Sequence, residues 1–389
     1  MARKIKTADQ IYFTKDHNMV RQALGDFVKK EVNPHVDQWE ADGVAPLKDL
    51  FKKMGKLGFL GIRYDPRYGG QGLDYWYDII FLEELGHIKA LGLSVAIAVQ
   101  THMATPAIDE FGSEYLKKTY LKAAIAGEMI GAIAVTEPDA GSDVAALATT
   151  AKKDGDDYVI NGSKIYITNG TQADFFTLLA RTREEPGYHS FSLLVVPASL
   201  PGVKVGRKLE KLGTHISDTA ELFFDNVRIP ARNLIGREGE GFIYQMKQFQ
   251  HERFALLPFA YVAARDIIDM TVAHIRKRVV FGKPLITRQV LRHRLANWLT
   301  EIECLKQFVY HIVRMKEAGL DATKEISMGK VVAGQLLTEV ADGCLQMYGG
   351  LGFMNEMLIS RYYRDARGLP IAGGAEEVML DYIAQIEGY

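Results

Sequence analysis

The spacing of hydrophobic positions predicts helices in the first third of the chain. Near the N-terminus, apolar side chains recur at helical spacing at Met19, Val20, Ala23, Leu24, Phe27, Val28 and Val32. Asn33-Pro34 predicts the end of this helix, because proline disfavours helical backbone at the residue before it. Another helix is expected to begin near Tyr75, after a glycine-rich turn. We therefore predict a helical domain over residues 1–128.

The pattern then changes to short apolar runs that are typical of strands. These runs cover residues 130–136, 175–180, 191–196 and 222–229. Asn161-Gly162 lies between two such runs and predicts a hairpin turn, and Asp154-Gly155 predicts another turn just upstream. The middle of the chain is therefore predicted to be a small antiparallel β-domain over residues 129–238.

Long helical periodicities return after residue 238. They cover roughly residues 241–280, 288–317, 323–350 and 372–386. Four such helices joined by short connections favour a four-helix bundle over residues 239–389. The predicted fold class is therefore α+β, with an N-terminal helical domain, a middle antiparallel β-domain and a C-terminal four-helix bundle.

Composition excludes several classes of partner. A formal charge of −1 gives no broad basic field for nucleic acid. We find no run of about 18 apolar residues, so no membrane insertion is expected. The basic segment 1–6 precedes no apolar signal core, so secretion is not expected. Cys304 and Cys344 lie in apolar helical surroundings, which predicts two buried thiols in a reducing compartment and no metal site.

Five segments together resemble the acyl-CoA dehydrogenase family, in the order in which that family carries them. They are AVTEPDAGSD at 134–143, NGSKIYITNG at 161–170, RVVFGKPL at 278–285, QMYGGLG at 346–352 and RDA at 364–366. The family fold has the same three parts that the hydrophobic pattern predicts. The resemblance implies an oxidoreductase of fatty acid β-oxidation that uses FAD to desaturate an acyl-CoA thioester between Cα and Cβ.

The resemblance also implies the residues that bind FAD. Family positions at the flavin and pyrophosphate correspond here to Val135, Thr136, Gly141, Ser142, Tyr166 and Thr168, with Tyr166 replacing a frequent tryptophan. The other FAD-binding positions of the family correspond here to Phe281, Gln289, Gln346, Gly350, Ala375, Glu377 and Arg278. The guanidinium fork of Arg278 suits a bidentate phosphate contact. In the family this contact reaches the FAD of a neighbouring subunit, which implies a homodimer or, more commonly, a homotetramer built as a dimer of dimers.

The usual catalytic glutamate of the family is absent from its loop position, where this chain has Gly373. Some relatives, including isovaleryl-CoA and long-chain acyl-CoA dehydrogenases, carry the base before an arginine on the first bundle helix. That pattern is His251-Glu252-Arg253 here, so Glu252 is the expected base for the α-proton while the β-hydride passes to flavin N5. Glu376 and Glu377 are rivals. The resemblance places substrate contacts at Ser142, Phe249, Arg253, Gly373 and Gly374.

The substrate and the electron acceptor stay open at this point. Residues 100–106 and 373–380 resemble citronellyl-CoA dehydrogenases, which suggests a branched or medium-to-long acyl chain. The resemblance implies electron-transfer flavoprotein as the acceptor, and a location in the bacterial cytoplasm or the mitochondrial matrix. Two alternatives are an acyl-CoA oxidase on the same fold and a catalytically silent flavin- or acyl-CoA-binding protein. A dehydrogenase that acts on an acyl-carrier-protein thioester in place of CoA is a variant of the dehydrogenase interpretation.

Overall fold

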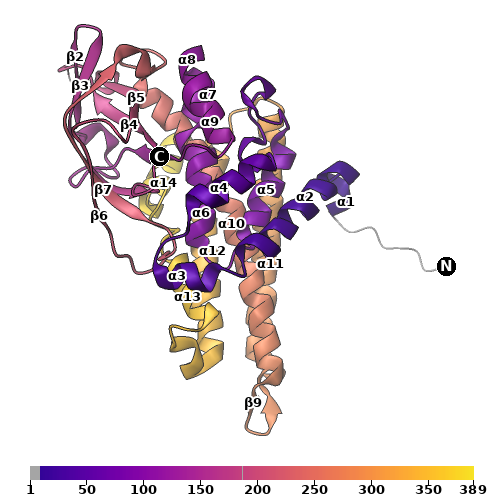
Figure 1. Ribbon diagram of the computed structural model, residues 1–389. Coiled ribbons are helices and arrows are strands. Elements are labelled where there is room, and N and C mark those ends of the chain that lie inside the picture. Colours follow the sequence, from indigo (N-terminus) through magenta and orange to yellow (C-terminus); the bar gives the residue numbers. More distant parts are fainter. Residues whose placement is uncertain (1–8, 186) are drawn as a thin grey trace.

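The computed structural model describes residues 9–185 and 187–389 (Figure 1), so the basic N-terminal segment lies outside the described residues. The described chain runs from helices to strands and back to helices, as the hydrophobic pattern predicts. Cap residues explain where two early helices begin. Thr14 accepts a hydrogen bond from the backbone N–H of His17, and Asp74 accepts from Trp76 and Tyr77.

The N-terminal region is entirely helical in its regular elements. Its α-helices are α1 (Asp9–Tyr12), α2 (Lys15–Phe27), α3 (Val36–Asp42), α4 (Leu47–Lys56), α5 (Tyr75–Gly86), α6 (Leu91–Ala98), α7 (Pro106–Phe111), α8 (Glu114–Leu116) and α9 (Lys122–Ile125). Among the described residues of this region, three π-helical segments connect these helices: η1 (Val28–Val32) extends α2, η4 (Val99–Ala104) joins α6 to α7, and η5 (Lys117–Leu121) joins α8 to α9.

One stretch of the described residues, Leu91–Phe111, is long and apolar enough to cross a membrane by length and composition. The expectation that no such run occurs is therefore wrong. Its most apolar window is 94% buried inside the fold, which is the condition of a core helix. Gln100, Thr101 and His102 interrupt the apolar residues of this stretch, although these polar side chains are also buried.

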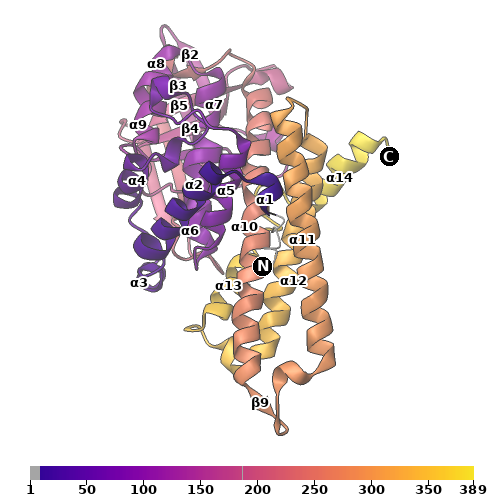
Figure 2. The ribbon, with the colours of Figure 1, turned by 90° about the vertical axis from the view of Figure 1, so that its right-hand side faces the viewer.

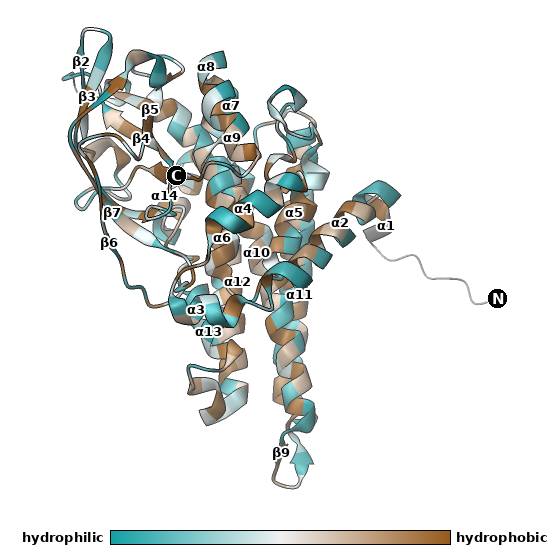
Figure 3. Cartoon of the chain, viewed as in Figure 1, coloured by the Kyte–Doolittle hydropathy of each residue, from teal (hydrophilic) through white to brown (hydrophobic). Residues whose placement is uncertain are grey.

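The middle region is a single eight-stranded sheet. Seven strands lie in the order β6-β7-β3-β2-β4-β5-β8, and β1 pairs with β4. The strands are β1 (Gly131–Ala134), β2 (Thr150–Asp154), β3 (Asp157–Thr168), β4 (Phe175–Arg181), β5 (Phe191–Pro197), β6 (Val203–Lys208), β7 (Thr219–Pro230) and β8 (Leu234–Ile235). β4 and β5 are buried on both faces and mostly brown in Figure 3. Their side chains belong to two core clusters, one of which includes residues of the covering helices.

Two details of the sheet differ from the sequence prediction. β1 and β2 each pair with β4 in parallel, so the sheet is mixed and not purely antiparallel. Asn161-Gly162 does not form a hairpin turn, because β3 continues through it and the hairpin lies at residues 154–157. β3 bulges between Ile160 and Gly162 while β7 pairs with it on both sides of the bulge. The long partner strand therefore outweighs the local turn signal.

The C-terminal region is built on three long helices that lie side by side in Figure 2. Its elements are α10 (Gly241–Lys277), β9 (Val279–Val280), β10 (Lys283–Pro284), α11 (Gln289–Glu317), α12 (Thr323–Tyr348), α13 (Leu358–Ala366) and α14 (Glu376–Glu387). α14 packs on α12 and stands out from the rest of the molecule (Figure 2). Residues 367–375 form a loop between α13 and α14, which we call the 367–375 loop.

The two cysteines differ in burial. Cys344 is fully buried in the bundle core, as the sequence predicts, and burial raises its pKa to about 11. Cys304 is exposed, so the prediction of two buried thiols is wrong for this residue. It lies between the core positions Ile302 and Leu305 on α11, on the face that turns away from the core.

Candidate functional site

The fold brings the two predicted flavin segments side by side. The N–H of Ile165 donates to the carbonyl of Thr136 across 2.9 Å, and the ammonium of Lys164 donates to the carbonyl of Val135 across 2.8 Å. These bonds join the end of β1 to the second half of β3. Thr136 and Thr168 stay partly exposed at this junction, where their hydroxyls are available to a ligand.

A buried ion pair fixes the loop that carries Gly141 and Ser142. Glu137 lies 2.8 Å from Lys164, whose side chain is fully buried. The same carboxylate accepts from the N–H groups of residues 148 and 149 at 2.7 and 2.9 Å. Gly141 and Ser142 are exposed on the loop closed by these bonds. Sequence reasoning assigned no role to this pair, although both residues stand inside the resembling motifs.

Tyr166 is held in an unusual backbone conformation. Its φ is 62°, in the left-handed region, and the register of β3 against β7 shifts between Lys164 and Ile167. A non-glycine residue rarely adopts this conformation without a functional reason. The bulge turns the Tyr166 ring outward, and the residue is 65% exposed. An aromatic face is thus presented at the surface of the strand that also carries Thr168, where the resemblance places the flavin.

A second predicted cofactor region lies at the far end of the bundle. Arg278, Gln346 and Gly350 line one cavity of about 580 Å³, which lies where α10 and α12 end. A Cβ placed on Gly350 would meet no atom within 4 Å, so this wall is open. A cavity of this volume with a guanidinium on its wall fits part of a dinucleotide.

The remaining predicted cofactor residues are spread over two places. Phe281 is 92% exposed at the turn between β9 and β10, and Gln289 is exposed at the start of α11. Both lie near the cavity wall without lining it. Ala375 caps α14, and Glu377 is exposed on its first turn. These four residues are not gathered into one site by a single chain.

Glu252 and Gly373 face each other. A Cβ built on Gly373 would lie 3.3 Å from Oε1 of Glu252 and 3.2 Å from Cδ1 of Leu256. Gly373 has φ +70°, a conformation that side chains rarely adopt. The carboxylate on α10 therefore reaches the position where a side chain from the 367–375 loop would begin.

The Glu252 carboxylate makes no hydrogen bond and no ion pair within the described residues. Burial raises its pKa, and the nearby charges of Arg253 and Lys330 lower the pKa without cancelling that effect. The rivals differ. Glu376 accepts a hydrogen bond from Gln335, and Glu377 points to solvent. Of the three glutamates, Glu252 is the one with a free carboxylate beside Gly373.

The loop that carries Gly373 is held by two cationic side chains. Nε of Arg253 donates to the carbonyl of Gly373 across 3.0 Å. Nζ of Lys330 on α12 donates to the carbonyls of Leu369 and Gly374 at 2.7 and 2.9 Å. Sequence reasoning missed Lys330. The available signal was a lysine at a buried position of an otherwise apolar helix face.

Phe249 and Arg253 lie together on α10. The Arg253 guanidinium is 5.7 Å from the centre of the Phe249 ring, and both residues are partly exposed. Gly374 lies close to Arg253 as well, since its Cβ would be 3.4 Å from the guanidinium. These three predicted substrate residues therefore gather beside Glu252, and Ser142 comes from the β-domain loop.

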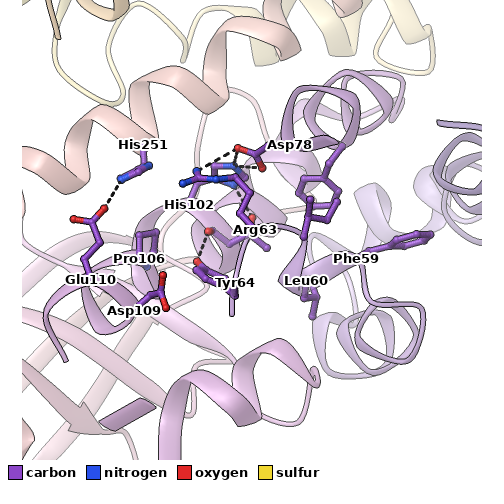
Figure 4. Close-up of a pocket in the computed structure, with 13 residues that line it drawn as sticks. Phe59, Leu60, Arg63, Tyr64, Asp78, His102, Pro106, Asp109, Glu110 and His251 are labelled. Atoms are coloured by element: carbon purple, nitrogen blue, oxygen red, sulfur yellow. Dashed lines mark hydrogen bonds and ion pairs between the residues drawn. The ribbon is translucent and has the colours of Figure 1, made fainter. Parts of the chain in front are cut away.

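His251 belongs to a different network on another face of α10 (Figure 4). Its Nε2 lies 3.1 Å from Oε1 of Glu110, and burial lowers its pKa. The same small cavity is lined by the buried pair Asp78 and His102, which are 3.1 Å apart, with Arg63 beside them. These groups pair with one another, so His251 belongs to this network and its side chain is not part of the Glu252 site.

The described geometry can be compared with known proteins. Family models for the N-terminal, middle and C-terminal domains of acyl-CoA dehydrogenase match residues 14–128, 132–227 and 239–387. The chain belongs to the acyl-CoA dehydrogenase family. The pig mitochondrial long-chain specific acyl-CoA dehydrogenase (Sus scrofa) is 38% identical over 96% of this chain and 86% of its own length.

Solved structures show the same relationship. An acyl-CoA dehydrogenase from Geobacillus kaustophilus is 39% identical, with a TM-score of 0.94 over 97% of this chain and 99% of that one. A glutaryl-CoA dehydrogenase from Mycobacterium smegmatis in complex with FADH2 is 30% identical, with a TM-score of 0.91 over 98% and 96%. This acyl-CoA dehydrogenase is therefore an FAD flavoprotein that dehydrogenates acyl-CoA. FAD, when bound, supplies the hydride acceptor of this chemistry.

Proposed function

We propose that the enzyme desaturates a branched or medium-to-long acyl-CoA between Cα and Cβ, with Glu252 as the catalytic base. The observation that carries this proposal is the 3.3 Å separation between Glu252 Oε1 and the Cβ position of Gly373. Relatives of the usual type carry their base at that loop position. In this chain the helix supplies a carboxylate to the same place.

The reaction balances with the groups at hand. The Cα–H bond breaks and its proton passes to the Glu252 carboxylate as the Cα–Cβ double bond forms, and FAD, when bound, would accept the hydride that leaves Cβ. A free carboxylate with a raised pKa is a stronger base than one in water, which favours proton transfer. Protonated Glu252 cannot accept the α-proton. The rate of flavin reduction should therefore rise with pH as Glu252 ionises around its raised pKa.

The thioester carbonyl needs hydrogen-bond donors as negative charge develops on its oxygen. Within the described residues no acceptor takes the backbone N–H of Gly373. This donor comes from the main chain, so replacing the loop glutamate with glycine leaves it in place. Arg253 binds the Gly373 carbonyl, which belongs to the next peptide group, and so anchors the loop beside this donor.

The nature of the substrate follows from the lining near Glu252. Leu256 is buried beside Glu252 and the Gly373 position, and Phe249 is partly exposed one turn earlier on α10, which favours an apolar acyl chain. The pig relative is named as long-chain specific, which supports a chain of at least medium length. We propose CoA, with Arg253 and Ser142 near its polar part, over a carrier-protein thioester.

FAD is proposed to be shared between subunits. Glu252 lies on α10 and Arg278 directly follows the last residue of that helix, so their separation of 26 positions (278 − 252) corresponds to about 39 Å along the helix axis. An extended FAD is shorter than this, and Figure 2 shows β9 at the opposite end of the bundle from the sheet. The pyrophosphate arginine of one chain therefore serves the flavin of another, in a homotetramer built as a dimer of dimers.

Exposed apolar side chains support this assembly. They lie near the cavity that Arg278 lines and on α14, at Val279, Phe281, Val290, Leu351, Phe353, Leu380, Tyr382 and Ile386. Large apolar side chains gathered at two places on a surface mark protein contacts. We propose that they are covered by neighbouring subunits.

Replacing Arg278 with alanine should weaken FAD retention, because a charge-assisted phosphate contact is lost. We expect the purified variant to be partly or wholly apoprotein after dialysis, and its oligomer to dissociate at higher protein concentration than the wild type does. Absorbance ratios and sedimentation measure both. Arg276→Ala, an exposed arginine on the same helix, is the control. Full flavin occupancy and an unchanged oligomer in Arg278→Ala would contradict the shared-FAD proposal.

The proposed function is tested by anaerobic titration of the FAD-loaded enzyme with a panel of acyl-CoAs. We expect loss of oxidised flavin absorbance with branched or medium-to-long chains. Transfer of the electrons to electron-transfer flavoprotein, and no peroxide in air, would separate the dehydrogenase from an oxidase. Binding of acyl-CoA without any bleaching would instead indicate a catalytically silent protein. We propose the bacterial cytoplasm or the mitochondrial matrix as its location; the pig relative is named as mitochondrial, and another relative comes from Bacillus subtilis.

A further inference from the structure

Lys330 occupies an unusual place for a lysine. It lies on α12 with only 1% of its surface exposed, and no carboxylate within the described residues forms an ion pair with it. Burying an ammonium without an ion-pair partner costs folding free energy unless hydrogen bonds compensate for the lost hydration. Its bonds go to the main-chain carbonyls of Leu369 and Gly374.

These two carbonyls flank the residue that faces the base. Leu369 and Gly374 bracket Gly373 in the 367–375 loop, and the Gly373 carbonyl itself is taken by Arg253. The loop is therefore tied to α12 by one cation and to α10 by another. Without both ties, a loop whose Gly373 and Gly374 have positive φ values could rotate its N–H groups away from the substrate.

We propose that Lys330 is a positioning residue for the desaturation, which holds the 367–375 loop in register with Glu252 and places a positive charge behind the base. This inference rests on the proposed function of Glu252. The charge acts at a distance, because Lys330 contacts loop carbonyls and not the carboxylate. Both effects would assist removal of the α-proton. A fixed loop N–H can donate to the thioester oxygen, and the nearby cation stabilises the ionised form of Glu252.

The charges around this site are few among the described residues. Glu252 is influenced by Arg253 on its own helix and by Lys330 on α12. Lys330 is influenced by Glu252, Arg253 and Glu376 on α14, and burial lowers its pKa to about 8. Below about pH 8 its cation lowers the pKa of Glu252. Removing that cation should therefore raise the pKa of Glu252 further. The low-pH side of the pH–rate profile, which we call the acid limb, should then move to higher pH.

Lys330→Met tests the proposal, since methionine keeps the unbranched stem and removes both charge and donors. Anaerobic flavin reduction by an acyl-CoA that bleaches the wild type should slow by about 10- to 100-fold at neutral pH, as expected for a small misplacement. The acid limb should move to higher pH, and Lys330→Arg should return it toward the wild-type position. Lys324→Met is the matched control, because Lys324 also lies on α12 but binds Glu387 at the surface.

A second measurement does not depend on activity. Arg367 is exposed at the start of the loop, so trypsin should cut after it faster in Lys330→Met than in the wild type or in Lys324→Met. If Lys330→Met does not retain FAD, Lys330→Gln replaces it. A wild-type rate or acid limb in these variants, or a loss of rate without any movement of the acid limb, would overturn the proposal. Failure of the wild type to be bleached by any acyl-CoA would instead remove the proposed function itself.

Discussion

Glu252→Gln should leave the enzyme yellow and able to bind acyl-CoA but nearly unable to reduce its flavin. The amide keeps the size and polarity of the side chain but cannot accept the Cα proton, and general base catalysis contributes about 100- to 10,000-fold. The loss should therefore fall on the rate of flavin reduction and hardly on the affinity for acyl-CoA. Stopped-flow absorbance under anaerobic conditions measures the rate, and equilibrium titration measures binding.

The matched control is Glu376→Gln. Glu376 stands on the first turn after the 367–375 loop, and its carboxylate already accepts a hydrogen bond from Gln335. Its neutral variant should reduce flavin at close to the wild-type rate. If Glu376→Gln is the slow variant and Glu252→Gln is not, the base comes from α14 and the assignment of Glu252 is wrong.

The second large effect is expected from moving the carboxylate between two elements. Glu252→Gly should be nearly inactive, and adding Gly373→Glu should recover a measurable fraction of flavin reduction. The reason is geometric, because the Cβ position of residue 373 lies 3.3 Å from Glu252 Oε1 in the native enzyme. A loop carboxylate would thus begin where the helix carboxylate ends.

Recovery should be partial for two reasons. Residue 373 has φ +70°, which strains any side chain, and the new Cβ would lie 3.2 Å from Leu256. A displacement of about 1 Å can cost on the order of 100-fold in rate. Gly373→Glu alone should be slow, since two close carboxylates repel each other.

Single-turnover flavin reduction in the four proteins measures this exchange, with FAD content and acyl-CoA binding as controls for folding. A double variant that binds both ligands, yet reduces flavin no faster than Glu252→Gly, would show that the two positions do not face the same Cα. A double variant faster than Glu252→Gly would support the base assignment independently of the amide variant.

Reading the sequence alone also led to errors, and each has a physical cause that the local pattern does not contain. Asn161-Gly162 is a strong turn signal in isolation, but β7 pairs with β3 on both sides of it, and the glycine is absorbed as a bulge. Cys304 has apolar neighbours along the chain, but it falls on the outer face of α11. The parallel pairing of β1 and β2 with β4 depends on connections that no local pattern encodes.

The sequence by itself determined the order of helical, strand and helical regions, the family, the cofactor and the short list of candidate bases. These follow from periodicity and from motifs, which are properties of residues close together in the chain. Only the tertiary structure decided which glutamate reaches Gly373, because residues 252 and 373 are brought together by packing between α10 and the loop after α13. The same holds for Lys330: the chemistry of its bonds is visible only when α12 and the 367–375 loop are in place. The spacing of apolar residues predicts which face of a helix is buried. It does not predict which element packs against that face, because this depends on contacts between residues far apart in the chain.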